Sequence, residues 1–154
     1  MLGIHGLEII GAGTGTIATN TVRIYPIYVP ARTVAFTKAL CEITGAVAAT
    51  AGSVGIYNED GVLVTSASVD TTSTGIKTVT LSPSVELPAG NYYVAATSND
   101  VATVVPTWRG QTPANVLNQK GVAVEASSGG ALPASIVPAS ITSDALFLPY
   151  VSFY

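Results

Sequence analysis

Charged residues are scarce in this chain of 154 residues. Lys, Arg, Asp and Glu together make up 10% of it and hydrophobic residues 48%, whereas about a quarter charged is usual for a soluble domain. The apolar residues are dispersed, and no run approaches the roughly 20 that a membrane-spanning helix needs. We therefore expect other subunits of an assembly, and no membrane, to cover part of the surface.

Basic residues are few as well. The six Lys and Arg residues stand singly along the chain, and the formal net charge is -3. Nucleic-acid binding by neutralisation of phosphates needs clustered Lys and Arg. The composition therefore disfavours a nucleic-acid partner.

The chain has one cysteine, Cys41, and one histidine, His5. A lone Cys in an apolar run is typical of a small buried hydrophobe. Zinc sites need several Cys and His ligands, and His5 lies in a Gly-rich segment without a nucleophile elbow. The nine carboxylates are dispersed, and folding can still bring two of them together as a glycosidase-type acid pair. We expect no cofactor, no metal and no enzymatic activity.

Residues 1–21 lack the basic and apolar regions of a signal peptide, so we expect synthesis in the cytoplasm. They are rich in Gly and Thr and carry the apolar residues Leu7, Ile9 and Ile10. The glycines at 11–15 lack the following helix and acidic residue of a dinucleotide-binding loop. We expect an extended N-terminal arm or a first edge strand here.

Residues 22–98 consist of short runs rich in Val, Ile, Thr and Tyr between turn signals, as is typical of antiparallel strands. Pro26 favours an edge position or an irregular entry into the sheet for the first run, because it cannot donate a ladder hydrogen bond. The alternation of the next run changes phase near Lys38, which predicts a β-bulge. Asn58-Glu-Asp-Gly61 predicts a tight hairpin turn.

The later strands follow from the same signals. Alternation predicts strands at 76–81 and 92–97, with a short connection between Pro83 and Gly90. A further strand is expected at 101–106, and a closing one at 146–154. Between them, about 106–140 is predicted to be a long loop region. The chain from 22 to 154 therefore predicts one all-β domain, an antiparallel β-sandwich.

Three side chains in this domain are candidate interface residues. Trp108 stands beside Arg109, and Trp and Arg are enriched at interface hot spots. The equal alternative is that Trp108 caps one end of the sandwich. Tyr93 is expected on the face of its strand opposite Tyr92, where it can contact a partner while Tyr92 is in the core.

Four motifs resemble a jelly-roll-type β-sandwich found in virion proteins of tailed bacteriophages. They are Tyr25-Pro-Ile-Tyr-Val-Pro30, Gly52-Ser-Val-Gly-Ile-Tyr57 with Asp60-Gly61, Thr74-Gly-Ile-Lys-Thr-Val-Thr-Leu81 and Leu87-Pro-Ala-Gly-Asn-Tyr-Tyr-Val-Ala-Ala96. The resemblance covers roughly Arg23 to Ser98. It implies a jelly-roll-like sandwich, a homotrimer on the virion and no cofactor.

Two locations on the virion fit this resemblance. Tail fibres usually carry coiled-coil heptads or Gly-x-y repeats, and this chain has neither. We therefore expect a capsid decoration (cement) protein on the capsid surface, made in the host cytoplasm. It would bind the major capsid protein through residues 1–21 and an apolar face, and would stabilise the shell by binding it.

The alternative is a tail fibre or tail-tip module that binds a receptor or a host surface glycan. Its candidate stacking residues are Tyr57, Tyr93 and Trp108. A third hypothesis is that the chain is a small hydrolase.

Overall fold

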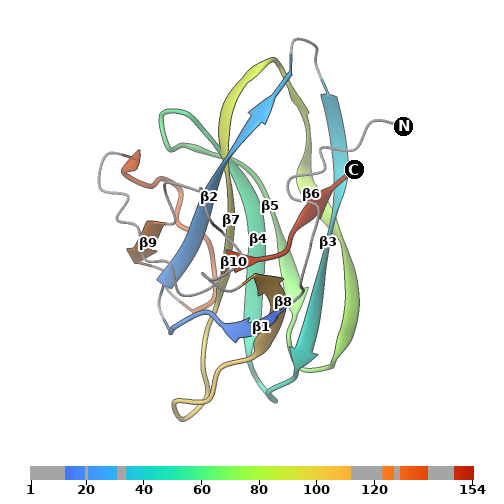
Figure 1. Cartoon of the computed structure of the whole chain (residues 1–154), viewed down its shortest axis with the longest axis vertical. Helices are drawn as coiled ribbons and strands as arrows, with labels where there is room; N and C mark the ends of the chain where they lie inside the picture. Colours follow the sequence, from blue (N-terminus) through green and yellow to red (C-terminus); the bar gives the residue numbers. More distant parts are fainter. Residues whose placement is uncertain (1–12, 20, 31–33, 112–122, 127–128, 139–147) are drawn as a thin grey trace.

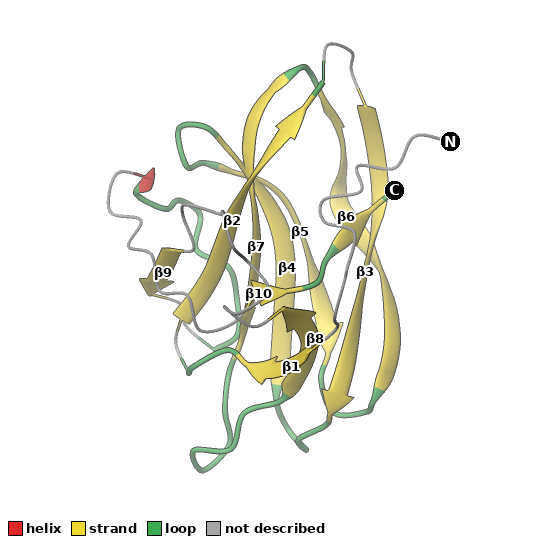
Figure 2. Ribbon diagram, viewed as in Figure 1, coloured by secondary structure: helices red, strands yellow, loops and turns green. Residues whose placement is uncertain are grey.

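The computed structural model describes residues 13–19, 21–30, 34–111, 123–126, 129–138 and 148–154 (Figure 1). Within these ranges the strands pair antiparallel and lie in two facing layers (Figure 2). The same residues contain no helix that is long and apolar enough to cross a membrane. The predicted all-β antiparallel sandwich is confirmed.

The two layers belong to one curled sheet. The strands are β1 Gly13–Thr16, β2 Thr21–Val29, β3 Val34–Gly45, β4 Ala51–Asn58, β5 Leu63–Asp70, β6 Gly75–Leu87, β7 Gly90–Ser98, β8 Thr107–Gln111, β9 Ala123–Ala126, β10 Leu148–Pro149 and β11 Ser152–Phe153. One layer has the order β1-β8-β3-β6 and the other β5-β4-β7-β2-β9, and the pair Ser66–Ser82 joins β5 to β6. β10 pairs with β8 and β11 with β3.

Strand β1 lies at one edge of the first layer, where it pairs with β8. Part of the range predicted as an arm or edge strand, Gly13–Thr16, is therefore an edge strand. Ile17, which follows it, is fully buried in the core. Residues 1–12, with Leu7, Ile9 and Ile10, lie outside the described residues.

Strand β2 pairs with β7 from Val22 to Val29, but on its other side it pairs with β9 only up to Ile24. Pro26 lies beyond the last β9 pair, where a missing N–H is tolerated. The edge position predicted from Pro26 is thus confirmed for the second half of β2, as far as the described residues show.

The β-bulge predicted near Lys38 is confirmed, because the register of β3 against β6 shifts between Phe36 and Lys38. A bulge places two successive residues opposite one residue of a partner strand. Here the N–H groups of Thr37 and Lys38 both donate to the Tyr154 carbonyl oxygen, each at 2.9 Å. The predicted closing strand is present as two short strands: β10 pairs with β8, and β11 pairs with β3 beside the bulge.

The predicted hairpin turn is confirmed between β4 and β5. The Asn58 side chain accepts a hydrogen bond from the Val62 N–H at 2.8 Å, and the Gly61 N–H donates to the Asn58 carbonyl oxygen at 3.0 Å. Gly61 has a φ of +80°, which a residue with a side chain rarely adopts. Asn58 and the backbone therefore hold the turn.

Two local predictions were wrong. Strand β6 does not end before Pro83 but continues to Leu87, and the Ser82–Pro83 peptide bond is cis. Residues 101–106 form no strand: Val101 and Val104 exchange two backbone hydrogen bonds of 3.0 Å around a tight turn. Ala102 and Thr103 adopt positive φ there, as the two central residues of a type I′ turn do.

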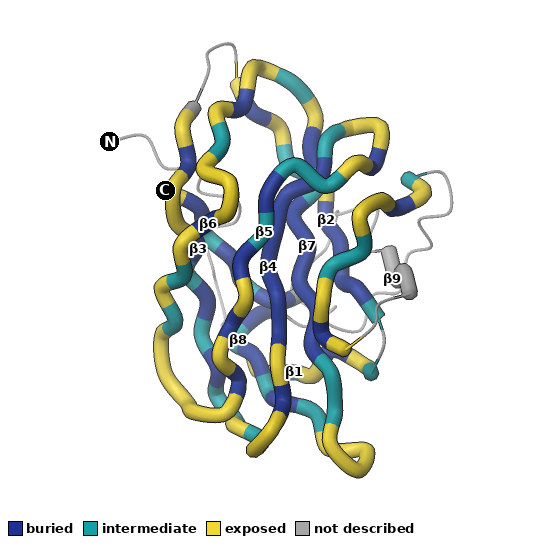
Figure 3. The backbone as a smooth tube through the Cα atoms, turned by 180° about the vertical axis from the view of Figure 1, so that it is seen from behind, coloured by how far each residue is buried: buried dark blue, intermediate teal, exposed yellow. Residues whose placement is uncertain are grey.

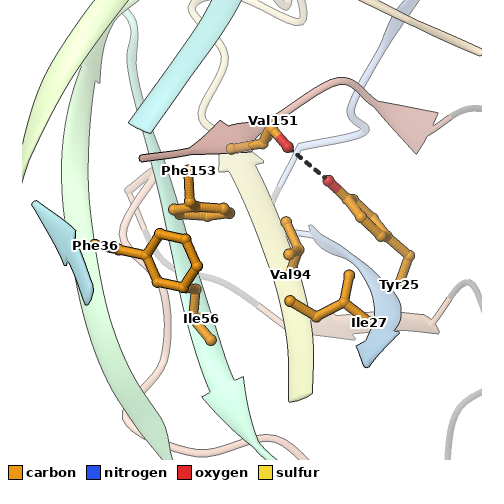
Figure 4. A pocket seen from close by; sticks show the side chains of 7 residues that line it. All are labelled: Tyr25, Ile27, Phe36, Ile56, Val94, Val151 and Phe153. Atoms are coloured by element: carbon orange, nitrogen blue, oxygen red, sulfur yellow. Dashed lines mark hydrogen bonds between the residues drawn. The ribbon is translucent and has the colours of Figure 1, made fainter. Parts of the chain in front are cut away.

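The core fills the space between the layers, and β4 and β7 are the most thoroughly buried strands (Figure 3). At one side of it, Phe36 and Phe153 meet edge to face, with ring centroids 6.2 Å apart (Figure 4). The Tyr25 hydroxyl donates to the Val151 carbonyl oxygen at 3.3 Å. Together with neighbouring apolar residues they line a small, partly open cavity of about 10 Å³, which is at the lower limit of the volume that one water molecule needs.

A covering segment, residues 129–138, packs on the outer face of the second layer. Ile136 and Leu132 join a second apolar cluster there with Val22, Ile24 and Tyr57. The Tyr57 hydroxyl donates to the Pro133 carbonyl oxygen at 2.7 Å, and the Ile136 N–H donates to that of Gly61 at 2.8 Å. The region predicted as a loop at 106–140 thus contains β8, β9 and this segment, all attached to the sheet.

Cys41 is a buried core residue, as predicted. Burial raises the pKa of its thiol to about 12. A group whose pKa is raised by folding stabilises the fold below its unfolded pKa of about 8.5–9 and loses that contribution as the pH rises. We expect the free energy of unfolding to fall by roughly 1–2 kcal/mol from this thiol between pH 8 and pH 10.

Urea unfolding at several pH values measures this fall. Cys41→Ala removes the thiol, so its stability should depend less on pH across the same interval. An equally steep decline in the variant would show that other groups cause the effect.

Candidate functional site

Trp108, a predicted interface residue, is fully buried in the chain and belongs to the core between the layers. Its ring packs on Gly52, where a Cβ atom would come within 3.0 Å of Trp108 Cζ2. The indole Nε1 is buried and has no hydrogen-bond partner among the described residues. A side chain with no accessible surface cannot contact a partner of this fold, so Trp108 is a core residue and not an exposed contact.

Arg109 points to the opposite face of β8, because successive residues of a strand alternate. Its Nε and Nη2 atoms donate to Glu42 Oε2 and Oε1 at 3.1 and 3.2 Å. This bidentate pair raises the pKa of the guanidinium above its ordinary value. Trp108 and Arg109 therefore do not act as one contact, and Arg109 is tied to Glu42 on the outer face of the first layer.

The three aromatic residues expected to stack on a glycan differ in how far they are buried. Tyr57 is fully buried beneath the covering segment, as Trp108 is in the core. Tyr93 is half-buried and keeps part of its ring accessible. Sequence reasoning missed Tyr28, whose side chain is 64% exposed on β2 beside Asn91.

The accessible tyrosine lines an open groove of about 470 Å³, which we call the Tyr93 groove. Three elements form it: β2, β7 and the β4–β5 turn (Figure 1). Its lining residues are Pro26, Glu59, Asp60, Asn91, Tyr92 and Tyr93. Its volume is in the range of small-molecule binding sites.

The register of the sheet explains why these residues meet. Strand β7 lies between β4 and β2, so Tyr93 stands opposite Tyr57 on one side and Pro26 on the other. The hairpin turn extends beyond β4 and brings Glu59 and Asp60 to the same side. Sequence predicted this turn and this strand separately but not that the two are neighbours.

Polar side chains in the groove are free to bind. Glu59, Asp60 and Asn91 are exposed, and the structure gives their side chains no hydrogen bond to another described residue. Tyr92 differs, because its ring is buried and its hydroxyl donates to the Pro88 carbonyl oxygen at 3.1 Å. The groove thus combines one accessible aromatic ring, one amide and two carboxylates.

The other polar cluster of the described chain lies on the β5–β6 loop and is satisfied internally. Asp70 accepts hydrogen bonds from Ser73, from the N–H and hydroxyl groups of Thr72, and from Lys77 at 3.2 Å. These bonds, that of Ser73 most of all, lower the pKa of the Asp70 carboxyl well below its ordinary value. Its acceptors are occupied, so this cluster holds the loop and offers less to a ligand than the groove.

No metal centre is evident among the described residues, which contain no group of three or more His, Cys, Asp and Glu placed to hold an ion. A scan of protein-family models and searches of curated proteins and of solved structures returned no match to this chain. The functional argument therefore rests on the residues and geometry described above.

Proposed function

We propose that this chain is a non-enzymatic structural protein of a tailed-bacteriophage virion that decorates the outer capsid surface and stabilises the shell. Two observations support the proposal. The motifs that resemble phage sandwiches lie on β2, β4 and β7 of the second layer and on β6 of the first. The low charge of the chain fits a surface that is covered in an assembly.

The observation that carries the docking geometry is an apolar loop end. The loops β3–β4, β5–β6 and β7–β8 gather at the end of the sandwich opposite the β4–β5 turn (Figure 1). Backbone hydrogen bonds join them, from the Val47 N–H to the Thr71 carbonyl oxygen and from the Asn99 N–H to that of Ala51. Apart from the Asp70–Lys77 ion pair where the β5–β6 loop begins and ends, residues 46–50, 71–74 and 99–106 contain a single charged residue, Asp100.

The β7–β8 turn is the most distinctive part of this end. Val101 and Val104 are 40% and 53% exposed. Ala102 and Thr103 hold φ values of 51° and 71°, where Asn and Gly are the usual residues. Strained backbone of this kind persists where the surroundings or a function require it. In our proposal the turn presents the two valines to the capsid.

Localisation on the particle tests the proposal. Immunogold labelling of intact virions with an antibody to this chain should place the label over the head. Label restricted to the tail, or particles without label, would overturn the decoration proposal. Sedimentation of the purified protein measures the homotrimer that the resemblance implies.

Docking through the loop end makes a further prediction. The double change Val101→Glu and Val104→Glu should weaken binding to particles that lack the protein at least about tenfold, because it places charges in an apolar contact. Val137→Glu changes another exposed valine and is the matched control. Co-sedimentation measures binding. Equal retention of both variants would exclude the loop end as the contact.

The Tyr93 groove favours a second candidate, the tail fibre or tail-tip module. A receptor-binding protein needs an accessible site with unoccupied polar groups, and the groove has both. If the chain is a tail module, the immunogold label should lie on the tail.

A further inference from the structure

The Tyr93 groove has the chemistry of a carbohydrate site, and sugar binding would be a function separate from attachment to a capsid. Tyr93 packs against the apolar cluster of Val22, Ile24 and Tyr57. Pro26 faces it across the strand pair. A tyrosine confined in this way provides contact area at low conformational-entropy cost. The C–H groups on one face of a sugar ring complement the electron-rich face of an aromatic ring.

The polar groups around the ring match the hydroxyl groups of a sugar. A carboxylate accepts from two adjacent hydroxyl groups, and an amide both donates and accepts. Asn91 provides the amide, and Glu59 and Asp60 provide the carboxylates. Asn58 already holds the hairpin turn through its own side chain, so neither carboxylate is needed for that purpose. All three groups are therefore available to a ligand.

Charge narrows the class of sugar. Among the described residues that line it, the groove has two carboxylates and no Lys, Arg or His. Repulsion between these carboxylates and a negatively charged sugar disfavours phosphorylated, sulfated or sialylated glycans. Neutral sugars avoid this repulsion, and the ammonium group of an amino sugar is attracted to Glu59 and Asp60.

We propose that the Tyr93 groove binds neutral or amino sugars, with a sugar ring against Tyr93 and its hydroxyl groups on Asn91, Glu59 and Asp60. The site lies on the β4–β5 turn, at the end of the sandwich opposite the apolar loop end (Figure 1). A protein docked through the loop end would keep the groove exposed. The inference concerns the isolated chain and holds whether the protein lies on the head or on the tail.

The test uses the purified full chain on a glycan array that includes lactose, glucosamine oligomers and sialyllactose. Binding should occur among neutral or amino-sugar glycans, and sialyllactose should bind no better than lactose. Absence of binding across the array, or a preference for sialylated members, overturns the proposal. Because no virion is present, this result is separate from that of the localisation experiment.

Variants then assign the sugar to the groove. Tyr93→Ala should lower the affinity for the best array ligand at least about tenfold, a change of about 1.4 kcal/mol, whereas Tyr93→Phe keeps the ring and most of the affinity. Asn91 is exposed, so Asn91→Ala should lower the affinity for the same ligand without unfolding the domain. Tyr154→Ala removes an exposed ring outside the groove and should bind normally. Unchanged binding by both Tyr93→Ala and Asn91→Ala would refute the site.

Discussion

Trp108→Ala should lower the free energy of unfolding by about 3–5 kcal/mol. Trp108 is the largest fully buried side chain of the core and contacts both layers, since it lies on β8 and packs on Gly52 of β4. Its truncation leaves a cavity that a close-packed sandwich fills only in part. Since domains are typically stable by about 5–15 kcal/mol, this single change brings the protein close to unfolding.

Trp108→Phe is the matched comparison. The indole Nε1 is buried without a hydrogen-bond partner in the described part of the chain, so replacing it removes a donor that is already unsatisfied there. We therefore expect a loss below about 2 kcal/mol. Urea unfolding followed by far-UV circular dichroism measures both variants, because the substitution removes the only tryptophan fluorophore. Equal losses of unfolding free energy in the two variants would show that the volume of the buried ring does not stabilise the core.

Gly61→Ala is the second large effect, with an expected loss on the order of 3 kcal/mol. A left-handed φ costs a non-glycine residue about 1–2 kcal/mol. In addition, a Cβ atom at Gly61 would collide with the Ile136 carbonyl oxygen and lie 2.9 Å from Pro138 Cδ. Overpacking of this kind typically costs about 1–3 kcal/mol. The hairpin turn and the covering segment should both be displaced.

Gly129→Ala separates the backbone cost of a positive φ from the cost of the steric contact. Gly129 has a similar positive φ of 60°, but a Cβ atom there meets nothing within 4 Å. Its substitution should therefore cost only the backbone term, about 1–2 kcal/mol. Thermal and urea unfolding compare the pair, and hydrogen exchange at Leu63 and Ile136 reports release of the covering segment. If the two substitutions cost the same, the contact with the covering segment does not stabilise the turn.

Local signals in the sequence were sufficient for the strands between residues 22 and 98, apart from the end of β6, and for the β4–β5 turn and the bulge. The change of phase around Lys38 is a property of a few adjacent residues, and so is the Asn58–Gly61 turn chemistry. Each of these features depends on the pleat and on backbone sterics, which short-range patterns report directly. The predicted core position of Tyr92 follows from the same alternation and is confirmed.

The errors and omissions had two causes: partners that lie far away in the chain, and a turn whose residues are not the usual turn formers. Trp108 and Arg109 are adjacent in sequence but lie on opposite faces of β8. The turn at Ala102 and Thr103 was missed because neither residue is a usual turn former at positive φ. The Tyr93 groove requires β7 to lie between β2 and β4, and no local pattern specifies that order.

The return of residues 148–154 to β8 and β3 also has a kinetic consequence. The core around Phe36 is complete only when Phe153, more than one hundred residues later, has paired beside it. A nascent chain on the ribosome therefore exposes this apolar surface until nearly all of these residues have emerged. Because such distant pairings raise contact order, we expect the domain to fold in milliseconds to seconds, and only once residues 148–154 are available.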